Sequence, residues 1–199
     1  GLGRPEEARA FLERNPDIEA VQLVITDANG VGRGKNIARE ELDALYGPGR
    51  NVAGSILGLD VTGEDVEETG LVWSVGDADQ CCRPVAGSLA RATWLTRPTA
   101  QVLGTMFELD GQPARADPRH VLAQVVNRLQ SHGLTPVVAV ELEFYLLQRE
   151  TDGRLQPARG LLSGARSARL DAYGLGRLDD MSPLFDELYA AARTLGLPV

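Results

Sequence analysis

The stretch Asp117–Leu147, DPRHVLAQVVNRLQSHGLTPVVAVELEFYLL, places a helical pattern directly before an apolar, strand-like pattern. Apolar side chains recur at three- and four-residue intervals, which indicates one face of a helix: Val121, Leu122, Val125, Val126 and Leu129. Asp117 is suited to cap the start of this helix, and Pro118 suits its first position. We therefore predict an amphipathic helix that begins at Pro118 and ends near Gly133.

The strand predicted over Val137–Leu147 contains two glutamates. Successive side chains of a strand alternate between faces, so Glu141 and Glu143 project from the same face, about 6.5–7 Å apart at Cα. Two neighbouring carboxylates repel each other unless water or a positive group screens them. The pattern leaves three interpretations open: a solvent-exposed polar face, pairing with Arg or Lys from elsewhere, or a site for hard divalent cations.

The remainder of the chain predicts a small mixed sheet followed by helices. We expect a β-hairpin over Ile18–Ala38 with its turn at Asn29-Gly30. Other expected elements are helices near residues 5–12, 39–46 and 182–195, a strand near 100–109, and short strands at 54–59 and 71–75 in an otherwise irregular stretch, 47–98. We expect two domains, residues 1–115 and residues 116–199.

Composition excludes several functional classes. The 199 residues carry a net charge of −8, which argues against a surface that binds nucleic acid or anionic membranes. No apolar run reaches the roughly 18–20 residues that span a membrane, and the polar N-terminus lacks a secretory signal pattern. The adjacent Cys81 and Cys82 form no disulfide framework. We expect a cytoplasmic protein with one buried and one partly exposed thiol.

Several ordered segments resemble the glutamine synthetase superfamily. Asp117–Leu147 resembles the family's first catalytic-domain helix and its "ExEF" strand. Upstream, DANGVGRGKNI, SILGLDVTGEDVEETGLVWSVGDADQCCRPV and RPTAQVLGTMFELDGQPARADPR resemble the N-terminal domain. The branch that the sequence resembles most is that of the γ-glutamylpolyamine (γ-glutamylputrescine) synthetases, and the resemblance covers about residues 10–150.

The resemblance implies an α+β fold, in which a β-grasp-like N-terminal domain precedes a catalytic domain built on an antiparallel sheet with helices. It implies a ligase that uses ATP to phosphorylate the γ-carboxylate of glutamate before an amine displaces the phosphate. Two Mg or Mn ions would assist this reaction, with Glu141 and Glu143 as metal ligands. The resemblance also implies a cytoplasmic homo-oligomer of stacked hexameric rings.

One departure from the family concerns the amine. Glutamine synthetases have "DGSS" where this chain has NVAGSILG, so Ser55 matches the last serine and Val52 the acidic position. A second acidic position of the ammonium-specific pattern falls near Gly70. This departure favours an amine such as putrescine over ammonium. Ser55 and Trp73 are expected in the amine region that one subunit contributes to its neighbour.

A second departure is the absence of the family's later metal and glutamate ligands. We expect the chain to hold only the start of the catalytic domain and to be inactive by itself. The alternatives are a glutamine synthetase that uses ammonium and a non-catalytic scaffold.

Other residues have less specific patterns. Arg33-Gly34-Lys35 suits a phosphate or subunit contact, but a solvated turn is the simpler interpretation. Trp73 and Trp94 are typical of core or interface anchors as well as of amine pockets. The arginines between Arg154 and Arg169 suit a solvated loop better than a phosphate site. His120 and His132 are expected at the surface.

Overall fold

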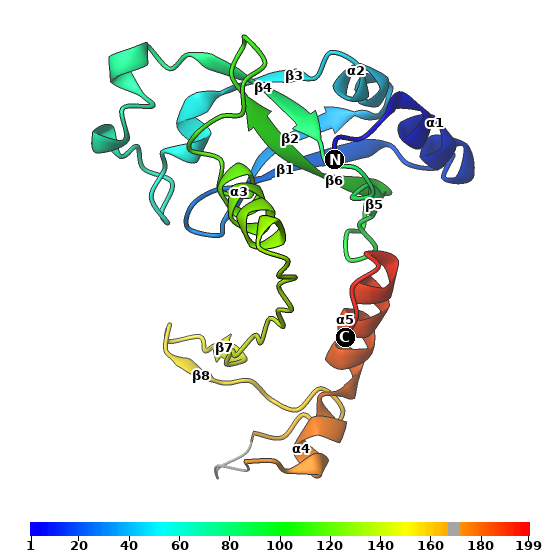
Figure 1. The fold of residues 1–199 in the computed structure, drawn as a ribbon. Coiled ribbons are helices and arrows are strands. Elements are labelled where there is room, and N and C mark those ends of the chain that lie inside the picture. Colours follow the sequence, from blue (N-terminus) through cyan, green and yellow to red (C-terminus); the bar gives the residue numbers. More distant parts are fainter. Residues whose placement is uncertain (167–171) are drawn as a thin grey trace. The chain divides into compact units, whose positions relative to one another are not determined.

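The computed structural model describes residues 1–166 and 172–199 (Figure 1). The chain divides into two compact units, Gly1–Pro136 and Val137–Val199, and each is described by itself. The domain boundary expected between residues 115 and 116 lies within the first of these units and stays a prediction.

The first unit is built on a mixed sheet. Its strands are β1 (Ala20–Thr26), β2 (Gly32–Ala38), β3 (Arg50–Ala53), β4 (Asp79–Pro84), β5 (Ala90–Arg91) and β6 (Thr99–Phe107). They lie in the order β2-β1-β6-β4-β3, with β5 paired to β6. The central strands β1 and β6 are parallel, whereas β1–β2 and β3–β4 are antiparallel. This arrangement confirms the predicted α+β class and the β-grasp-like order.

Alternation along β1 explains which face of the sheet is covered. Val21, Leu23 and Ile25 are buried, while the residues between them face outward or are partly covered. Helices α1 (Pro5–Arg14) and α2 (Leu42–Tyr46) lie side by side near one end of the sheet (Figure 1). A 3-10 turn, Arg39–Glu41, leads into α2. The buried residues of both helices join those of the sheet in one apolar core: Ala8, Phe11, Leu42, Leu45 and Tyr46.

The irregular stretch contains structure that the sequence did not predict. Strands β3 and β4 lie within it, and the segments expected as strands near 54–59 and 71–75 instead contain 3-10 helices, Gly54–Leu57 and Trp73–Val75. A further 3-10 helix spans Glu67–Thr69. Strand β4 carries the motif DQCCRP, whose polar residues hide its period-two pattern. Backbone hydrogen bonds to β6 stabilise β4, and this long-range pairing cannot be predicted from the local sequence.

Helix α3 (Pro118–Ser131) confirms the predicted helix and both of its ends. Asp117 accepts a hydrogen bond from the backbone N–H of Arg119 at 2.8 Å. At the other end, Gly133 has φ +73°, and the N–H groups of Gly133 and Leu134 donate to the carbonyls of Gln130 and Leu129. These two bonds form a Schellman cap. On the apolar face of α3, Val121, Leu122 and Val125 are exposed, whereas Val126 and Leu129 are partly covered.

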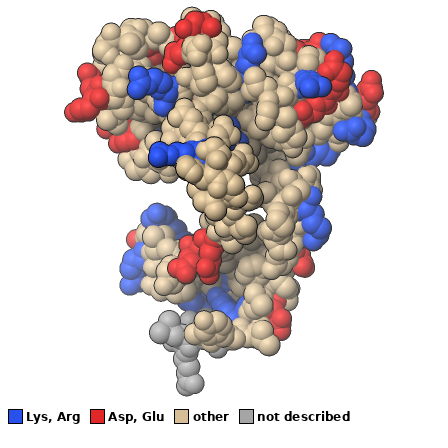
Figure 2. All heavy atoms as spheres, in the orientation of Figure 1, with Lys and Arg blue, Asp and Glu red and all other residues tan. Residues whose placement is uncertain are grey.

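The second unit contains β7 (Leu147–Arg149) and β8 (Leu155–Pro157), which pair as a hairpin, and helices α4 (Leu175–Asp180) and α5 (Ser182–Thr194). Helix α5 confirms the predicted terminal helix, whereas the hairpin and α4 lie in a stretch interpreted as a loop. Within the part of the chain that the structure describes, no helix is long and apolar enough to cross a membrane. On the face shown in Figure 2, side chains of both charges are interspersed over the first unit.

Candidate functional site

The strand predicted over Val137–Leu147 is wrong for most of its length. Residues 137–146 have no regular secondary structure, and only Leu147 enters β7. Val137, Val140 and Leu142 expose at least 80% of their surface. A strand needs a neighbour to satisfy its N–H and C=O groups, and residues 137–146 have no ladder partner among the described residues. The apolar pattern thus marks a segment that could form a strand, but no neighbouring strand lies beside it among the described residues.

Glu141 and Glu143 lie in this exposed segment. Neither has a salt-bridge partner among the described residues, so the structure gives no support to pairing with Arg or Lys. The described residues contain no group of three or more His, Cys, Asp or Glu side chains that could hold a metal ion. Carboxylate oxygens suit Mg, but two such ligands are too few for a protein-held ion. By themselves, the described residues therefore do not form a metal centre, and the role of Glu141 and Glu143 as metal ligands stays a prediction.

The expected amine region lies on an excursion between β3 and β4, residues 54–78. Its neck is closed by a hydrogen bond from the N–H of Gly54 to the carbonyl of Ala78 at 2.9 Å. Ser55 lies on the first 3-10 helix of this excursion and Trp73 on the last. Trp73 is 70% exposed as a residue, so it is no core anchor. Both residues thus belong to one surface excursion.

Val52 and Gly70 stand at the two positions compared with acidic residues of the ammonium site, and neither presents a functional side chain to a substrate. Val52 is 2% exposed and packs in the apolar core, so it presents no side chain to a substrate. Gly70 has φ +70° and ends the 3-10 helix Glu67–Thr69. A glycine suits this left-handed conformation. Gly70 therefore allows the left-handed backbone conformation that ends this 3-10 helix.

The sequence pattern suggested that Arg33 lies in a solvated turn, and this interpretation is wrong, because Arg33 lies on β2 with a largely buried side chain. Its Nε donates to Oδ2 of Asp27 at 2.9 Å, and its Nη2 donates to the carbonyl of Asp60 at 2.6 Å. The side chains of Arg33 and Asp27 are 17% and 0% exposed. Burial raises the pKa of the Asp27 carboxyl, but hydrogen bonds from Arg33, Val31 and Asn29 outweigh it, so the net pKa is lowered. Sequence reasoning missed Asp27 and Asp60.

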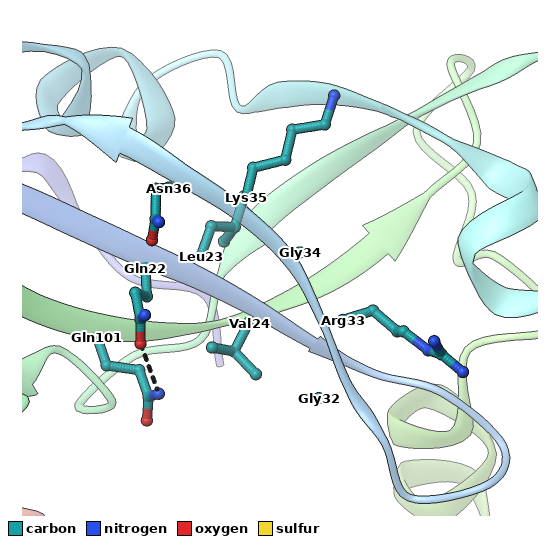
Figure 3. Close-up of a pocket in the computed structure, with 9 residues that line it drawn as sticks. All are labelled: Gln22, Leu23, Val24, Gly32, Arg33, Gly34, Lys35, Asn36 and Gln101. Carbon is teal, nitrogen blue, oxygen red and sulfur yellow. Dashed lines mark hydrogen bonds between the residues drawn. The ribbon is translucent and has the colours of Figure 1, made fainter. Parts of the chain in front are cut away.

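The outer face of β2, β1 and β6 carries a row of amides (Figure 3). Asn36 lies opposite Gln22, which lies opposite Gln101, and Nε2 of Gln101 donates to Oε1 of Gln22 at 3.5 Å. Gly32 and Gly34 leave a pocket of about 340 Å³ beside this row. The face is polar and open, and the described residues that line it form no titratable cluster with catalytic geometry.

A second buried carboxylate joins β6 to α3. Oδ2 of Asp117 accepts hydrogen bonds from the hydroxyl of Thr105 at 2.6 Å and from the N–H of Met106 at 2.7 Å. Nε2 of His120 lies 2.8 Å from the carbonyl of Met106, and its ring packs edge-on against Phe107. The surface position predicted for His120 is therefore wrong, because its ring is held between strand and helix. His132 is exposed as predicted.

The two cysteines differ as predicted. Cys82 is buried and Cys81 partly exposed. Burial raises the pKa of Cys82 to about 12. Cys82 therefore carries a structural thiol in the core.

The arginines of the second unit make local contacts. Arg154 pairs with Asp152, Arg166 with Glu150, and Arg159 donates to the carbonyl of Gly164. Arg169, the last residue of the predicted arginine-rich loop, lies outside the described residues.

Comparisons with known proteins identify the class. Residues 115–199 match the family described as the glutamine synthetase catalytic domain. The chain is 36% identical over 200 residues to γ-glutamylputrescine synthetase of Escherichia coli, which covers 100% of this chain and 42% of that protein. It is 30% identical over 145 residues to glutamate–isopropylamine ligase of a Pseudomonas species, covering 71% of this chain and 31% of the relative. The chain belongs to the glutamine synthetase family.

The fold agrees with this assignment. The ligand-free structure of GmaS matches with a TM-score of 0.63 at 18% identity, over 94% of this chain and 39% of that one. At this identity the likeness concerns the fold alone. The chain spans less than half the length of each of these relatives.

Proposed function

We propose that this chain supplies the N-terminal domain and the first catalytic-domain segment of an ATP-dependent ligase that joins the γ-carboxylate of glutamate to an amine such as putrescine. The observation that carries the proposal is 36% identity over the whole chain to a γ-glutamylputrescine synthetase. A second relative, named as a glutamate–isopropylamine ligase, supports a small amine as the acceptor.

The proposed reaction proceeds in two steps. The γ-carboxylate of glutamate attacks the γ-phosphorus of ATP, which releases ADP and forms γ-glutamyl phosphate. The neutral amine then attacks the acyl carbon, the C–O bond to phosphate breaks, and the nitrogen loses a proton. The amide and inorganic phosphate are the products. Ser55 and Trp73 would belong to the region that receives the amine, on the surface of the 54–78 excursion.

Kinetics with several amines test this function. The natural full-length protein is assayed with glutamate, ATP and either putrescine, isopropylamine or ammonium, and ADP release is followed together with the mass of the γ-glutamyl product. We expect the highest kcat/KM with an organic amine. A higher kcat/KM with ammonium would support the glutamine synthetase alternative, and no product with any amine would support the scaffold alternative.

We propose that Glu141 and Glu143 become ligands of divalent ions, Mg or Mn, when strand partners order their segment. Bound ions would offset the negative charge of the phosphates. Their exposed carboxylates lack ion-pair partners among the described residues, which leaves their oxygens available. Glu141→Gln and Glu143→Gln in the full-length protein should weaken Mn binding measured by electron paramagnetic resonance. Glu187→Gln, an exposed position of α5, is the matched control and should bind Mn as the wild type does.

We also propose that the 199 residues by themselves do not catalyse ligation, because they provide only two carboxylates of the implied metal site. Formation of a γ-glutamyl amide by the purified chain would overturn this statement.

In the full-length protein we propose a cytoplasmic homo-oligomer of stacked hexameric rings. Uncovered apolar residues on α3 support burial against further structure: Val121, Leu122 and Val125. Light scattering of the full-length protein gives its mass.

A further inference from the structure

Two turns, each organised by an aspartate, face each other at one end of the sheet. The first is the turn between β1 and β2. Oδ1 of Asp27 accepts hydrogen bonds from the N–H groups of Asn29 and Val31, both at 2.9 Å. The N–H of Asp27 donates to the carbonyl of Val31 at 3.1 Å. One buried carboxylate therefore fixes the conformation of the hairpin turn.

The second turn lies within the 54–78 excursion, where Leu59 and Asp65 form an antiparallel bridge around it. Oδ1 of Asp60 accepts from the N–H groups of Thr62, Gly63 and Glu64 at 2.8–3.0 Å, and from the Thr62 hydroxyl at 2.7 Å. The N–H of Asp60 donates to the carbonyl of Glu64 at 2.9 Å. Its carboxylate is thus used within its own turn. Its backbone carbonyl accepts from the N–H of Gly63 at 3.1 Å and has a second lone pair for a donor from elsewhere.

Arg33 connects the two turns. Its guanidinium donates to the carboxylate of Asp27 on one side and to the carbonyl of Asp60 on the other. A second link runs in parallel, because Nδ2 of Asn29 donates to the carbonyl of Leu59 at 2.9 Å. Gly63 allows this approach, since a Cβ built there would lie 3.2 Å from Nη1 of Arg33. The planar fork of arginine reaches both acceptors at once.

The ion pair makes this connection sensitive to substitution. Removing one partner of a buried pair leaves an uncompensated charge, which is strongly unfavourable. Without Arg33, the carboxylate of Asp27 would be buried without its cation, and the carbonyl of Asp60 would lose one of two donors and keep the N–H of Gly63. The excursion would keep the hydrogen bond at its neck, the packing of its apolar residues and the bond from Asn29. The turn at residues 60–64 would be the first part to open.

We propose that Asp27 and Arg33 are positioning residues, which hold the 54–78 excursion in the conformation that presents Ser55 and Trp73 to the amine. This inference rests on the proposed function for the identity of the ligand. The connection itself rests on the hydrogen bonds between the hairpin turn and the excursion. Neither residue touches the reacting atoms. Arg33 acts through the backbone carbonyl of Asp60, and Asp27 orients both Arg33 and the backbone of Asn29, whose side chain contacts Leu59.

Hydrogen exchange tests the connection independently of any activity. In the full-length protein, Arg33→Met should speed exchange of the Gly63, Glu64 and Val66 amides by about tenfold, while the amides that pair β1 with β6 keep their wild-type rates. The matched control is Arg39→Met. Arg39 is also partly buried and donates to the carbonyls of Asn15, Pro16 and Ile18, at the other end of β1. That variant should leave exchange in the excursion unchanged.

Steady-state kinetics test the consequence for the amine. Arg33→Met should raise the KM for the amine about fivefold or more, while the KM values for glutamate and ATP stay within about twofold of wild type. Arg33→Lys keeps a positive charge beside Asp27 but lacks the fork, so it should restore part of the amine affinity. A uniform loss of kcat with all three KM values unchanged would contradict positioning.

The outcomes separate the inference from the function on which it rests. If exchange in the excursion is the same in Arg33→Met and wild type, the connection is overturned. If exchange rises but the KM for the amine does not, the link to the amine is overturned. If the wild type ligates no amine, the proposed function fails, and with it the link to the amine, whereas the exchange experiment still decides whether Arg33 holds the excursion.

Discussion

The hydroxyl of Thr105 donates a hydrogen bond of 2.6 Å to Oδ2 of Asp117, and both side chains are buried. Because Thr105 lies on β6 and Asp117 caps α3, this bond ties the last strand of the sheet to the first helix of the region that matches the catalytic-domain family. The N–H of Met106 donates to the same oxygen. One carboxylate thus holds the helix at a fixed place on the sheet.

Asp117→Asn should lower the free energy of unfolding by about 2 kcal/mol, because an amide N–H₂ would replace an acceptor that faces two donors. Urea unfolding measures the change, and tryptophan fluorescence reports on the first unit, which contains both Trp73 and Trp94. Asp110→Asn is the control. Its carboxylate accepts from Gln112 in an exposed turn, and its change should stay within about 0.5 kcal/mol. Equal effects of the two variants would contradict the role given to Asp117.

Asp27 should make stability depend on pH. Its pKa in the folded protein lies below the ordinary value of 3.8, so its charged form stabilises the fold above that value, and the contribution is lost as the pH falls through the folded pKa. The stability difference between wild type and Asp27→Asn should therefore be largest near neutral pH and should shrink below pH 3.8.

Ile37→Val is the control for this pH series, because it changes a buried core residue without altering a titratable group. Its stability deficit should remain constant across the same pH range. Thermal unfolding in a pH series measures both differences. A wild type–Asp27→Asn difference that stays constant or grows as the pH falls would show that Asp27 is not stabilised in its charged form.

Gly34→Ala should destabilise the first unit by more than about 2 kcal/mol, because Gly34 has φ +147° and its Cβ would lie 1.8 Å from the carbonyl oxygen of Leu23. Gly111→Ala separates this clash from backbone strain. Gly111 also has a positive φ, +87°, but open space around its Cβ, so its cost should be about 1 kcal/mol. Urea unfolding compares the two, and a smaller loss for Gly34→Ala than for Gly111→Ala would be inconsistent with this packing.

Native alkylation should distinguish the two cysteines. The pKa of Cys82 is raised to about 12 by burial, so at pH 8 its thiolate is scarce and its sulfur inaccessible. Iodoacetamide should label Cys81 in the folded chain and both cysteines in urea, as read by peptide mass mapping. Labelling of Cys82 in the folded chain as fast as Cys81 would mean that β4 is not packed as described.

Local pattern predicted the elements whose side chains repeat regularly. The apolar spacing around Val121 predicted α3, and the hairpin Ile18–Ala38 followed from its alternation and turn residues. Strand β4 was missed because its pairing with β6 is a long-range property. The strand around Glu141 was predicted from its apolar residues, but a strand forms only with a neighbour, and none lies among the described residues.

Less of the candidate site could be predicted from local sequence. Ser55 and Trp73 were placed in the amine region through resemblance alone; both lie on the 54–78 excursion, and their role with the amine stays a prediction. The contact between Arg33 and Asp60 joins residues 27 positions apart, so no local pattern indicates it. The bond from the N–H of Asn29 to Asp27 could have been expected from the DANG turn, where an aspartate commonly bonds to the backbone two residues on, but the ion pair with Arg33 could not.

The most direct test of the central claim is a competition in one vessel. The natural full-length protein is given glutamate, ATP, putrescine and ¹⁵N-labelled ammonium at equal concentrations, and mass spectrometry measures the initial ratio of γ-glutamylputrescine to labelled glutamine. We predict that the γ-glutamylputrescine product exceeds glutamine by at least about tenfold. An excess of labelled glutamine, or neither product while ATP remains unhydrolysed, would contradict the assignment of this chain to an amine ligase.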